Sequence, residues 1–267
     1  MRRVLTAIDL ADATIRTEIV NPSADTTILL IHGWGSARHV WNRLVAAAGP
    51  ETRLVLVDLR GHGQSSRALN RHSIDGMADD LEQLLLRLRL AKMVVVGHSM
   101  GGNVAVELAV RRPDLVAGVC CVDPAYDDPG WADAETRVED LRDRGVQAAL
   151  ATLPAAFSPT ASPDLLREAA DTLGSTGIDV LIEALRSTYL DERAFGHHTE
   201  THQKLLQLTA PMLSVYAAPD RAERATRFPL ADHVVETIAD TGHFIPLEQP
   251  TRLWRTLNAW IGSSATG

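Results

Sequence analysis

Residues 93–112 read MVVVGHSMGGNVAVELAVRR, and this stretch decides the fold. The apolar run Met93–Gly97 predicts a buried strand, and Met100–Arg112 predicts a helix that ends before a proline. Between them, Gly97-His98-Ser99-Met100-Gly101 has the G-x-S-x-G spacing of a sharp strand-to-helix turn that exposes its serine. The free N–H groups at the start of the helix favour a developing negative charge there. We therefore predict Ser99 to be a nucleophile.

Similar short apolar runs alternate with helical patterns along the rest of the chain. The predicted strands are Thr27–Ile31, Arg53–Asp58, Val116–Asp123, Met212–Tyr216 and the less apolar Val234–Ile238. The first 20 residues predict half-exposed antiparallel strands at a sheet edge, and helices are predicted at Ile74–Leu88, with Ser73 as N-cap, and at Thr251–Ile261. Strands that alternate with helices predict an α/β fold with a mostly parallel, doubly wound sheet.

One interval lacks this alternation. Residues 125–210 contain helical patterns broken by prolines and glycines but no convincing strand. Both ends of the interval join strands of the same sheet, so we expect a helical cap inserted late into a core formed by residues 1–124 and 211–267. Bulky apolar cap residues such as Trp131 and Phe157 are expected to shape a substrate pocket.

Composition excludes several classes of protein. The 267 residues are 45% hydrophobic and 22% charged, as in ordinary globular proteins. A net charge of −8 argues against nucleic-acid or anionic-membrane binding. No apolar run could span a bilayer or form a signal peptide, and two adjacent cysteines suit a reducing compartment. We expect a cytoplasmic protein with no membrane or nucleic-acid partner; its oligomeric state is not encoded in any recognisable pattern.

A serine hydroxyl needs a base before it can attack a carbonyl. His243 follows the last predicted strand and precedes the last helix, in the stretch Gly242-His243-Phe244. Catalytic groups of open parallel sheets gather in loops at the carboxyl ends of the strands. We therefore predict His243 as the general base.

Four motifs together give the chain a resemblance to the α/β-hydrolase fold family over nearly its whole length. They are His32-Gly33-Trp34-Gly35, Asp58-Leu59-Arg60-Gly61-His62-Gly63, the serine motif, and Gly242-His243 followed by Glu248-Gln249-Pro250. The resemblance implies acyl transfer through a covalent serine ester, with the triad in the chain order serine, acid, histidine. It also implies an oxyanion hole made by the backbone N–H groups of Met100 and Trp34.

The acid of the triad has two candidates. Asp220 has the spacing from Pro211 that the family uses after its penultimate strand, although Ala217-Ala218-Pro219 stands where the family usually has glycine. Asp123 is the alternative, because it ends the preceding strand, where some family members place their acid. The resemblance favours Asp220.

Other polar residues are expected to be structural. His32 supports its loop, His62 lies in a tight turn under the site, and Cys120 and Cys121 are buried on opposite faces of a strand. His198 and His202 share a helix face without a recognisable third metal ligand, so no metal is expected. No phosphate-binding loop indicates a nucleotide cofactor.

These observations predict a cofactor-free serine hydrolase acting on a small apolar carboxylic ester or lactone. The fold also hosts C–C bond hydrolases, cofactor-free dioxygenases and lyases, so another chemistry is an alternative. A non-catalytic ligand receptor that keeps only the pocket is a second alternative.

Overall fold

An eight-stranded sheet forms the centre of the protein, in the order β1-β2-β4-β3-β5-β6-β7-β8. The computed structural model describes residues 1–67, 71–90, 92–126, 132–228 and 230–264. β1 pairs antiparallel with β2 and β2 antiparallel with β4, while every later pairing is parallel. The strands are β1 (Arg3–Asp9), β2 (Thr14–Val20), β3 (Thr26–Ile31), β4 (Thr52–Val57), β5 (Met93–His98), β6 (Val116–Val122), β7 (Met212–Tyr216) and β8 (His233–Thr237).

Alternate residues of the central strands supply two separate hydrophobic layers. In β3, Leu29 and Ile31 join one buried cluster, whereas Ile28 and Leu30 join the other. Cys120 and Cys121 divide in the same way, and both are free thiols. Successive side chains of a strand point to opposite faces, so continuous apolar runs require helices on both sides of the sheet.

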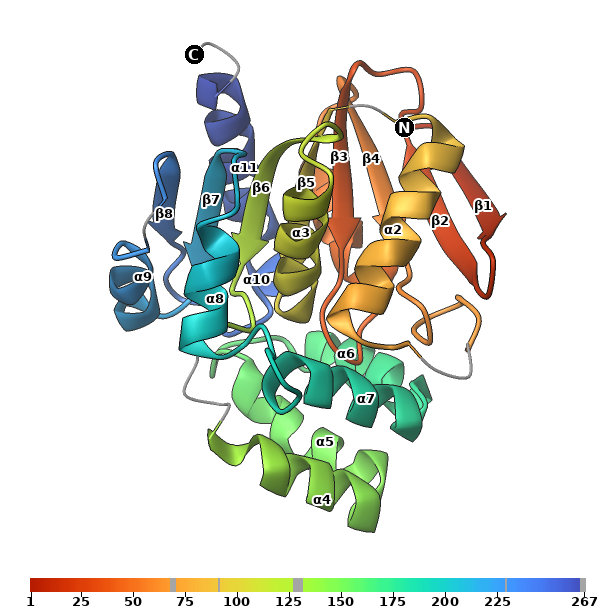
Figure 1. Ribbon diagram of the computed structural model, residues 1–267, viewed down its shortest axis with the longest axis vertical. Helices are drawn as coiled ribbons and strands as arrows, with labels where there is room; N and C mark the ends of the chain where they lie inside the picture. Colours follow the sequence, from red (N-terminus) through yellow and green to blue (C-terminus); the bar gives the residue numbers. More distant parts are fainter. Residues whose placement is uncertain (68–70, 91, 127–131, 229, 265–267) are drawn as a thin grey trace.

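Helices cover both faces. α2 (Ile74–Leu88), α3 (Met100–Arg111) and α8 (His198–Leu205) lie on the near face in Figure 1, while α1 (Asn42–Ala47) and α11 (Pro250–Ser264) pack together on the other. Along the chain, α9 (Pro219–Ala225) connects β7 to β8, and α10 (Ile245–Glu248) precedes α11. Ser73 caps α2, since its side chain accepts a hydrogen bond from Gly76 N. The mostly parallel, doubly wound α/β fold is thereby confirmed.

A layer of helices lies below the carboxyl ends of the strands in Figure 1. It consists of α4 (Ala134–Arg144), α5 (Val146–Thr152), the 3-10 helix η3 (Leu153–Ala156), α6 (Pro163–Ser175) and α7 (Ile178–Tyr189). All of it is inserted between β6 and β7. α8 falls inside the range predicted for the cap, but it packs beside α3 along the sheet. The division into core and cap at 124/125 and 210/211 stays a prediction.

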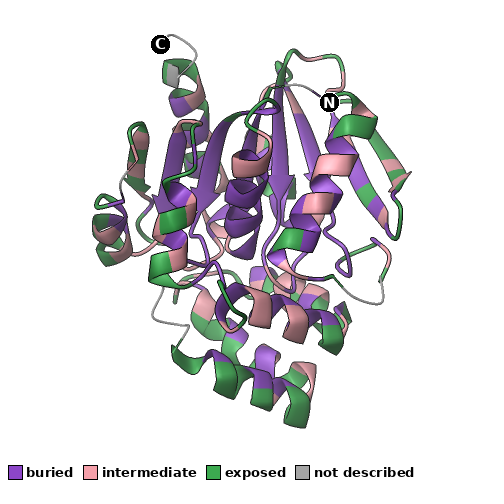
Figure 2. Ribbon diagram, in the orientation of Figure 1, coloured by how far each residue is buried: buried purple, intermediate pink, exposed green. Residues whose placement is uncertain are grey.

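Burial follows these layers. Figure 2 shows the central strands buried along their length, whereas the outer surfaces of α4 and of the edge strand β1 are exposed. Within the described ranges, the structure has no helix of the length and apolarity needed to cross a membrane.

Candidate active site

The turn between β5 and α3 holds Ser99 in a strained backbone conformation. Ser99 has φ +52° and ψ −123°, a region that residues with a side chain rarely adopt. Its N–H donates to Val122 O at 2.9 Å, which fixes the turn to the end of β6. A Cβ atom at Gly97 would lie 2.0 Å from Gly101 O, and one at Gly101 would lie 2.5 Å from His32 O. Only glycine fits at both positions, as the spacing predicted.

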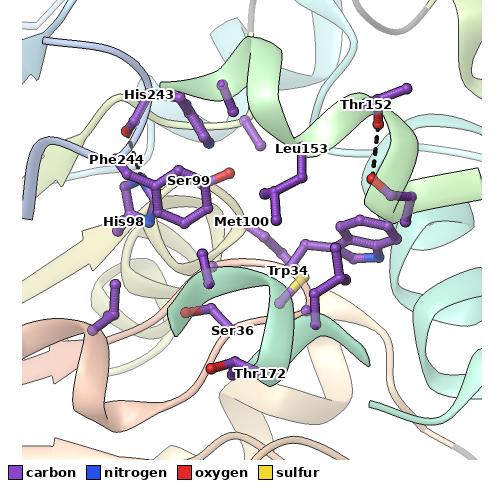
Figure 3. A pocket seen from close by; sticks show the side chains of 18 of the residues that line it. Trp34, Ser36, His98, Ser99, Met100, Thr152, Leu153, Thr172, His243 and Phe244 are labelled. Atoms are coloured by element: carbon purple, nitrogen blue, oxygen red, sulfur yellow. Dashed lines mark hydrogen bonds between the residues drawn. The ribbon is translucent and has the colours of Figure 1, made fainter. Parts of the chain in front are cut away.

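Ser99 lines a cavity of about 250 Å³ between the strand ends and the cap. Figure 3 shows Ser99, His243 and Phe244 on one side of this cavity and Trp34 on the other. The cap contributes apolar side chains to the lining, among them Leu153, Leu173 and Leu185. The cavity therefore places a polar end, with serine and histidine, next to a largely apolar space.

His243 makes the contact that a general base requires. Its Nδ1 lies 2.6 Å from Asp123 Oδ2. Because an ionised carboxylate only accepts hydrogen bonds, Nδ1 carries the proton and Nε2 is left as the basic nitrogen. The carbonyl of His243 accepts a hydrogen bond from His98 Nε2 at 2.8 Å, drawn in Figure 3. Burial, followed by the charge of His243, lowers the pKa of His98 to about 3, so His98 is a neutral donor.

Asp123 is held ionised in a nearly buried position, with 5% of its side chain exposed. Burial alone would raise its pKa. The hydrogen bond and charge of His243, the charge of Arg221 and the N–H of Ala217 outweigh that effect and lower the pKa of Asp123 to about 2. Arg221 Nη1 lies 3.2 Å from Asp123 Oδ2, and Ala217 N donates to Oδ1 at 3.3 Å.

Asp220 does not reach the site, so the prediction that it orients His243 is wrong. Its side chain is 71% exposed and pairs with Arg224 at 2.9 Å, one turn later on α9. Because Ala218 precedes α9 in an extended conformation and Pro219 begins the helix, Asp220 falls in the first turn on an exposed face. The next residue, Arg221, faces the site instead. The alternative acid, Asp123, is the one that contacts His243.

Two backbone N–H groups are available where the oxyanion hole was predicted. Both Met100 and Trp34 line the cavity, and neither N–H donates to another atom among the described residues. A Cβ at Gly33 would lie 2.9 Å from Ser99 Cβ, so the loop that carries Trp34 runs against Ser99. The Trp34 indole donates to Leu181 O of α7 at 2.8 Å, which anchors this loop to the cap.

Comparison with known proteins places this geometry in a family. The model of the alpha/beta hydrolase fold matches residues 26–177, which carry the first three of the four motifs. The chain belongs to the α/β-hydrolase fold family. Membership in this family supports hydrolase activity.

Several relatives of this α/β-hydrolase match over nearly the whole chain at low identity. The biotin biosynthesis bifunctional protein BioHC of Teredinibacter turnerae is 25% identical over 94% of this chain but only 47% of the relative, so the chain spans about half its length. Among solved structures, an esterase from Thermogutta terrifontis has a TM-score of 0.83 at 24% identity and covers 99% of both chains. The enol-lactonase from Burkholderia xenovorans has a TM-score of 0.84 at 20% identity, covering 96% of this chain and 100% of its own.

Two further histidines of the α/β-hydrolase motifs are fully buried below the site. His32 Nε2 accepts from Leu59 N at 3.0 Å, and His32 Nδ1 donates to Gly33 O at 2.8 Å. His32 thus fixes the loop before Trp34, as expected. His62 Nδ1 lies 3.0 Å from Arg60 O. Burial lowers the pKa of His32 to about 4 and that of His62 to about 3, so both are neutral.

The remaining sequence candidates lie away from the cavity. The rings of His198 and His202 lie side by side on α8, tilted by 45° with centroids 4.2 Å apart, and neither residue lines the cavity. In the described part of the chain no three metal-binding side chains come together. Phe157 packs behind the cavity, stacked on Phe244 at 4.6 Å, rather than lining it. Trp131 lies outside the described residues.

Sequence reasoning missed two residues that shape the site. His98 was taken only as the variable position of the serine motif, and Arg221 was not considered. No spacing in the sequence pairs Arg221 with Asp123, because the two residues come from different strand ends. The only available signal was the position of Arg221 beside a suspected catalytic aspartate.

Proposed function

We propose that this chain is a serine hydrolase that cleaves a small carboxylic ester or lactone through an acyl-enzyme intermediate. The observation that carries the proposal is the 2.6 Å contact of His243 Nδ1 with Asp123, in the cavity that Ser99 lines from a strained turn. The esterase and enol-lactonase structures that share the fold support this substrate class.

In the proposed reaction, Ser99 Oγ attacks the carbonyl carbon while His243 Nε2 takes the hydroxyl proton. Asp123 keeps the imidazole in the correct tautomer and stabilises the imidazolium that forms. The negative charge on the carbonyl oxygen is stabilised by the N–H groups of Met100 and Trp34. When the C–O bond breaks, His243 gives its proton to the leaving alkoxide.

Water completes the cycle. His243 takes a proton from water, the hydroxide attacks the acyl carbon, and Ser99 leaves with the proton that His243 returns. An ester yields an acid and an alcohol, whereas a lactone yields one hydroxy acid. Each step uses side chains and backbone N–H groups of the protein together with water, so the proposed mechanism needs no metal or organic cofactor.

The apolar lining favours an apolar acyl group. Val40, Leu153, Leu173 and Leu185 face the cavity, and apolar pockets select ligands by fit.

We further propose a cytoplasmic location for the protein. The two free cysteines support this location, because free thiols suit a reducing compartment. Fractionation of cells that express the tagged protein would test it.

The proposal is tested with a fluorophosphonate probe and a panel of chromogenic esters and lactones. The wild-type protein should gain one phosphonyl group, on Ser99, and should hydrolyse at least one substrate of the panel. Ser99→Ala should lose labelling and nearly all turnover. Ser36→Ala, which alters another serine of the cavity lining, is the matched control and should retain both.

Two outcomes would overturn it. Wild-type turnover in Ser99→Ala would require a different nucleophile or a different chemistry. A wild-type protein that binds panel compounds but is neither labelled nor active would instead be a ligand receptor.

A further inference from the structure

The loop that carries His243 lies directly against the cap. His243 N donates to Ala156 O, in η3, at 2.7 Å. Gly242 sits so close to the same segment that an added Cβ would lie 2.4 Å from Ala156 O and 2.6 Å from Phe157 Cα. The backbone position of the general base therefore depends on where this part of the cap lies.

Glu248 joins the two segments. It is the last residue of α10, and its Oε1 accepts a hydrogen bond from Gly242 N at 2.9 Å. Its other oxygen, Oε2, accepts from Ser158 N at 3.1 Å, two residues after η3 ends. One carboxylate thus satisfies a backbone N–H on each side of the contact. Charge-assisted bonds of this kind are roughly twice as strong as bonds between neutral groups.

Glu248 is absent from the cavity lining, although Phe244 and Leu247 of the same loop are part of it. Its carboxylate accepts from Gly242 N, and its own N–H donates to Phe244 O at 3.0 Å, so it is bonded to both neighbours of His243. We therefore expect Glu248 to act on the reaction through the position of the loop.

We propose that Glu248 is a positioning residue, which sets the place of His243 by tying its loop to the cap segment 156–158. The inference rests on the proposed function, since it assigns His243 the role of base. A displacement of about 1 Å in a catalytic group can cost 10²-fold in rate. The clamp also means that the cap segment and the base move together.

Glu248→Gln is the sharpest variant because it keeps the size of the side chain. A glutamine has one oxygen and one NH₂ group, so one of the two backbone N–H groups must face another donor. We expect kcat to fall about 10- to 100-fold, with KM changed less than about 3-fold, because Glu248 lies outside the cavity lining. The rate of phosphonate labelling of Ser99 should fall by the same factor as kcat, since both need His243 as base.

Glu223→Gln is the matched control. It removes the same charge from an exposed carboxylate of α9, which pairs with Arg227 just beyond the helix, and it should leave kcat and labelling unchanged. Active-site titration separates an effect on rate from a loss of folded protein. A Glu248→Gln enzyme with wild-type kcat per titrated site would overturn the proposal, and so would a fall in turnover without a fall in labelling rate.

The cap side of the clamp is tested with Ser158→Pro, which removes the backbone N–H that donates a hydrogen bond to Glu248. Phe157 is already extended, at φ −109° and ψ 155°, as a residue before proline must be. If the clamp acts as one unit, the double variant with Glu248→Gln should be no slower than the slower single variant. Effects on kcat that multiply would show that Glu248 acts without the cap, and would refute the coupling.

A readout independent of activity separates this inference from the proposed function. The Nδ1 proton of His243, hydrogen-bonded to Asp123, should give a downfield NMR signal that shifts or broadens in Glu248→Gln and not in Glu223→Gln. An unchanged signal would contradict the positioning role even in a fully active enzyme. A protein without activity or labelling that still shows the shift would refute the proposed function alone.

Discussion

Replacing Asp123 with asparagine should lower kcat about 10³- to 10⁴-fold. Asp123 receives three donors, from His243, Arg221 and Ala217. An asparagine offers one oxygen to them. If its NH₂ group faces His243, Nδ1 must become an acceptor and the proton moves to Nε2, which can then no longer take the proton of Ser99.

The lost charge gives the magnitude. A carboxylate about 4 Å from the imidazolium centre stabilises it by about 4 kcal/mol at an effective dielectric constant near 20, which is roughly 10³-fold in rate. The wrong tautomer adds to that loss, and removal of the orienting acid in such triads costs about 10⁴-fold. The pKa of Asp123, near 2 instead of 3.8, shows that the site favours the ionised form.

The assay is steady-state hydrolysis of the best panel substrate, with active sites counted by phosphonate titration. Asp220→Asn serves as the comparison, because that exposed side chain pairs only with Arg224 among the described residues, and its kcat should stay within about 2-fold of wild type. A severe loss in Asp220→Asn together with a mild loss in Asp123→Asn would refute the assignment of the acid.

Three further predictions follow from the cavity, the buried histidines and the chemistry. Leu153→Ala should shift the ratio of kcat/KM between short and long acyl esters by about 10-fold or more, because it enlarges the apolar lining; the exposed Leu206→Ala should not, and equal losses on all esters would contradict a role in selectivity. The unfolded state binds a proton on each histidine near pH 6.5, whereas burial lowers the pKa of folded His62 to about 3, so stability should fall as the pH drops from 7 to 4. In urea titrations, His62→Gln should reduce the loss of unfolding free energy between pH 7 and pH 4 by about 3 kcal/mol, whereas the exposed His198→Gln should leave that loss unchanged. Parallel plots of unfolding free energy against pH for wild type and His62→Gln would disprove this. Incubation with EDTA should leave the hydrolysis rate unchanged, and a loss that zinc restores would show that the serine mechanism is incomplete.

The sequence predicted the strands and helices of the core closely because their signals are local. Thr27–Ile31 was predicted and Thr26–Ile31 is observed, and the predicted helix Met100–Arg112 is observed as Met100–Arg111. The turn at Ser99 was equally predictable, because the close contact that requires Gly97 is with Gly101, only four residues along the chain.

The acid could not be chosen from spacing alone. Asp123 and Asp220 follow neighbouring parallel strands, so both begin at the edge of the sheet where His243 lies. The choice depends on backbone detail: Asp123 adopts φ +44°, while Pro219 starts a helix that turns Asp220 outward. The clamp by Glu248 was hidden for a similar reason, since its partner Ser158 lies 90 residues away in a segment without a recognisable motif.

The position of Asp123 directly after β6 also bears on how such enzymes could be remodelled. From Val94 and Gly118 onward, β5 and β6 pair residue by residue up to His98 and Val122, so one ladder of the sheet sets the spacing of Ser99 and Asp123, which follow them. In the described part of the chain, every cap helix follows both Ser99 and Asp123 in sequence. An exchanged or lengthened insertion could therefore bring a new substrate range without disturbing either residue. His243, the proposed base, lies in the loop that contacts the inserted segment at Ala156 and Phe157. Compatibility between a transplanted insertion and the 242–248 loop should therefore decide which chimeras keep their activity.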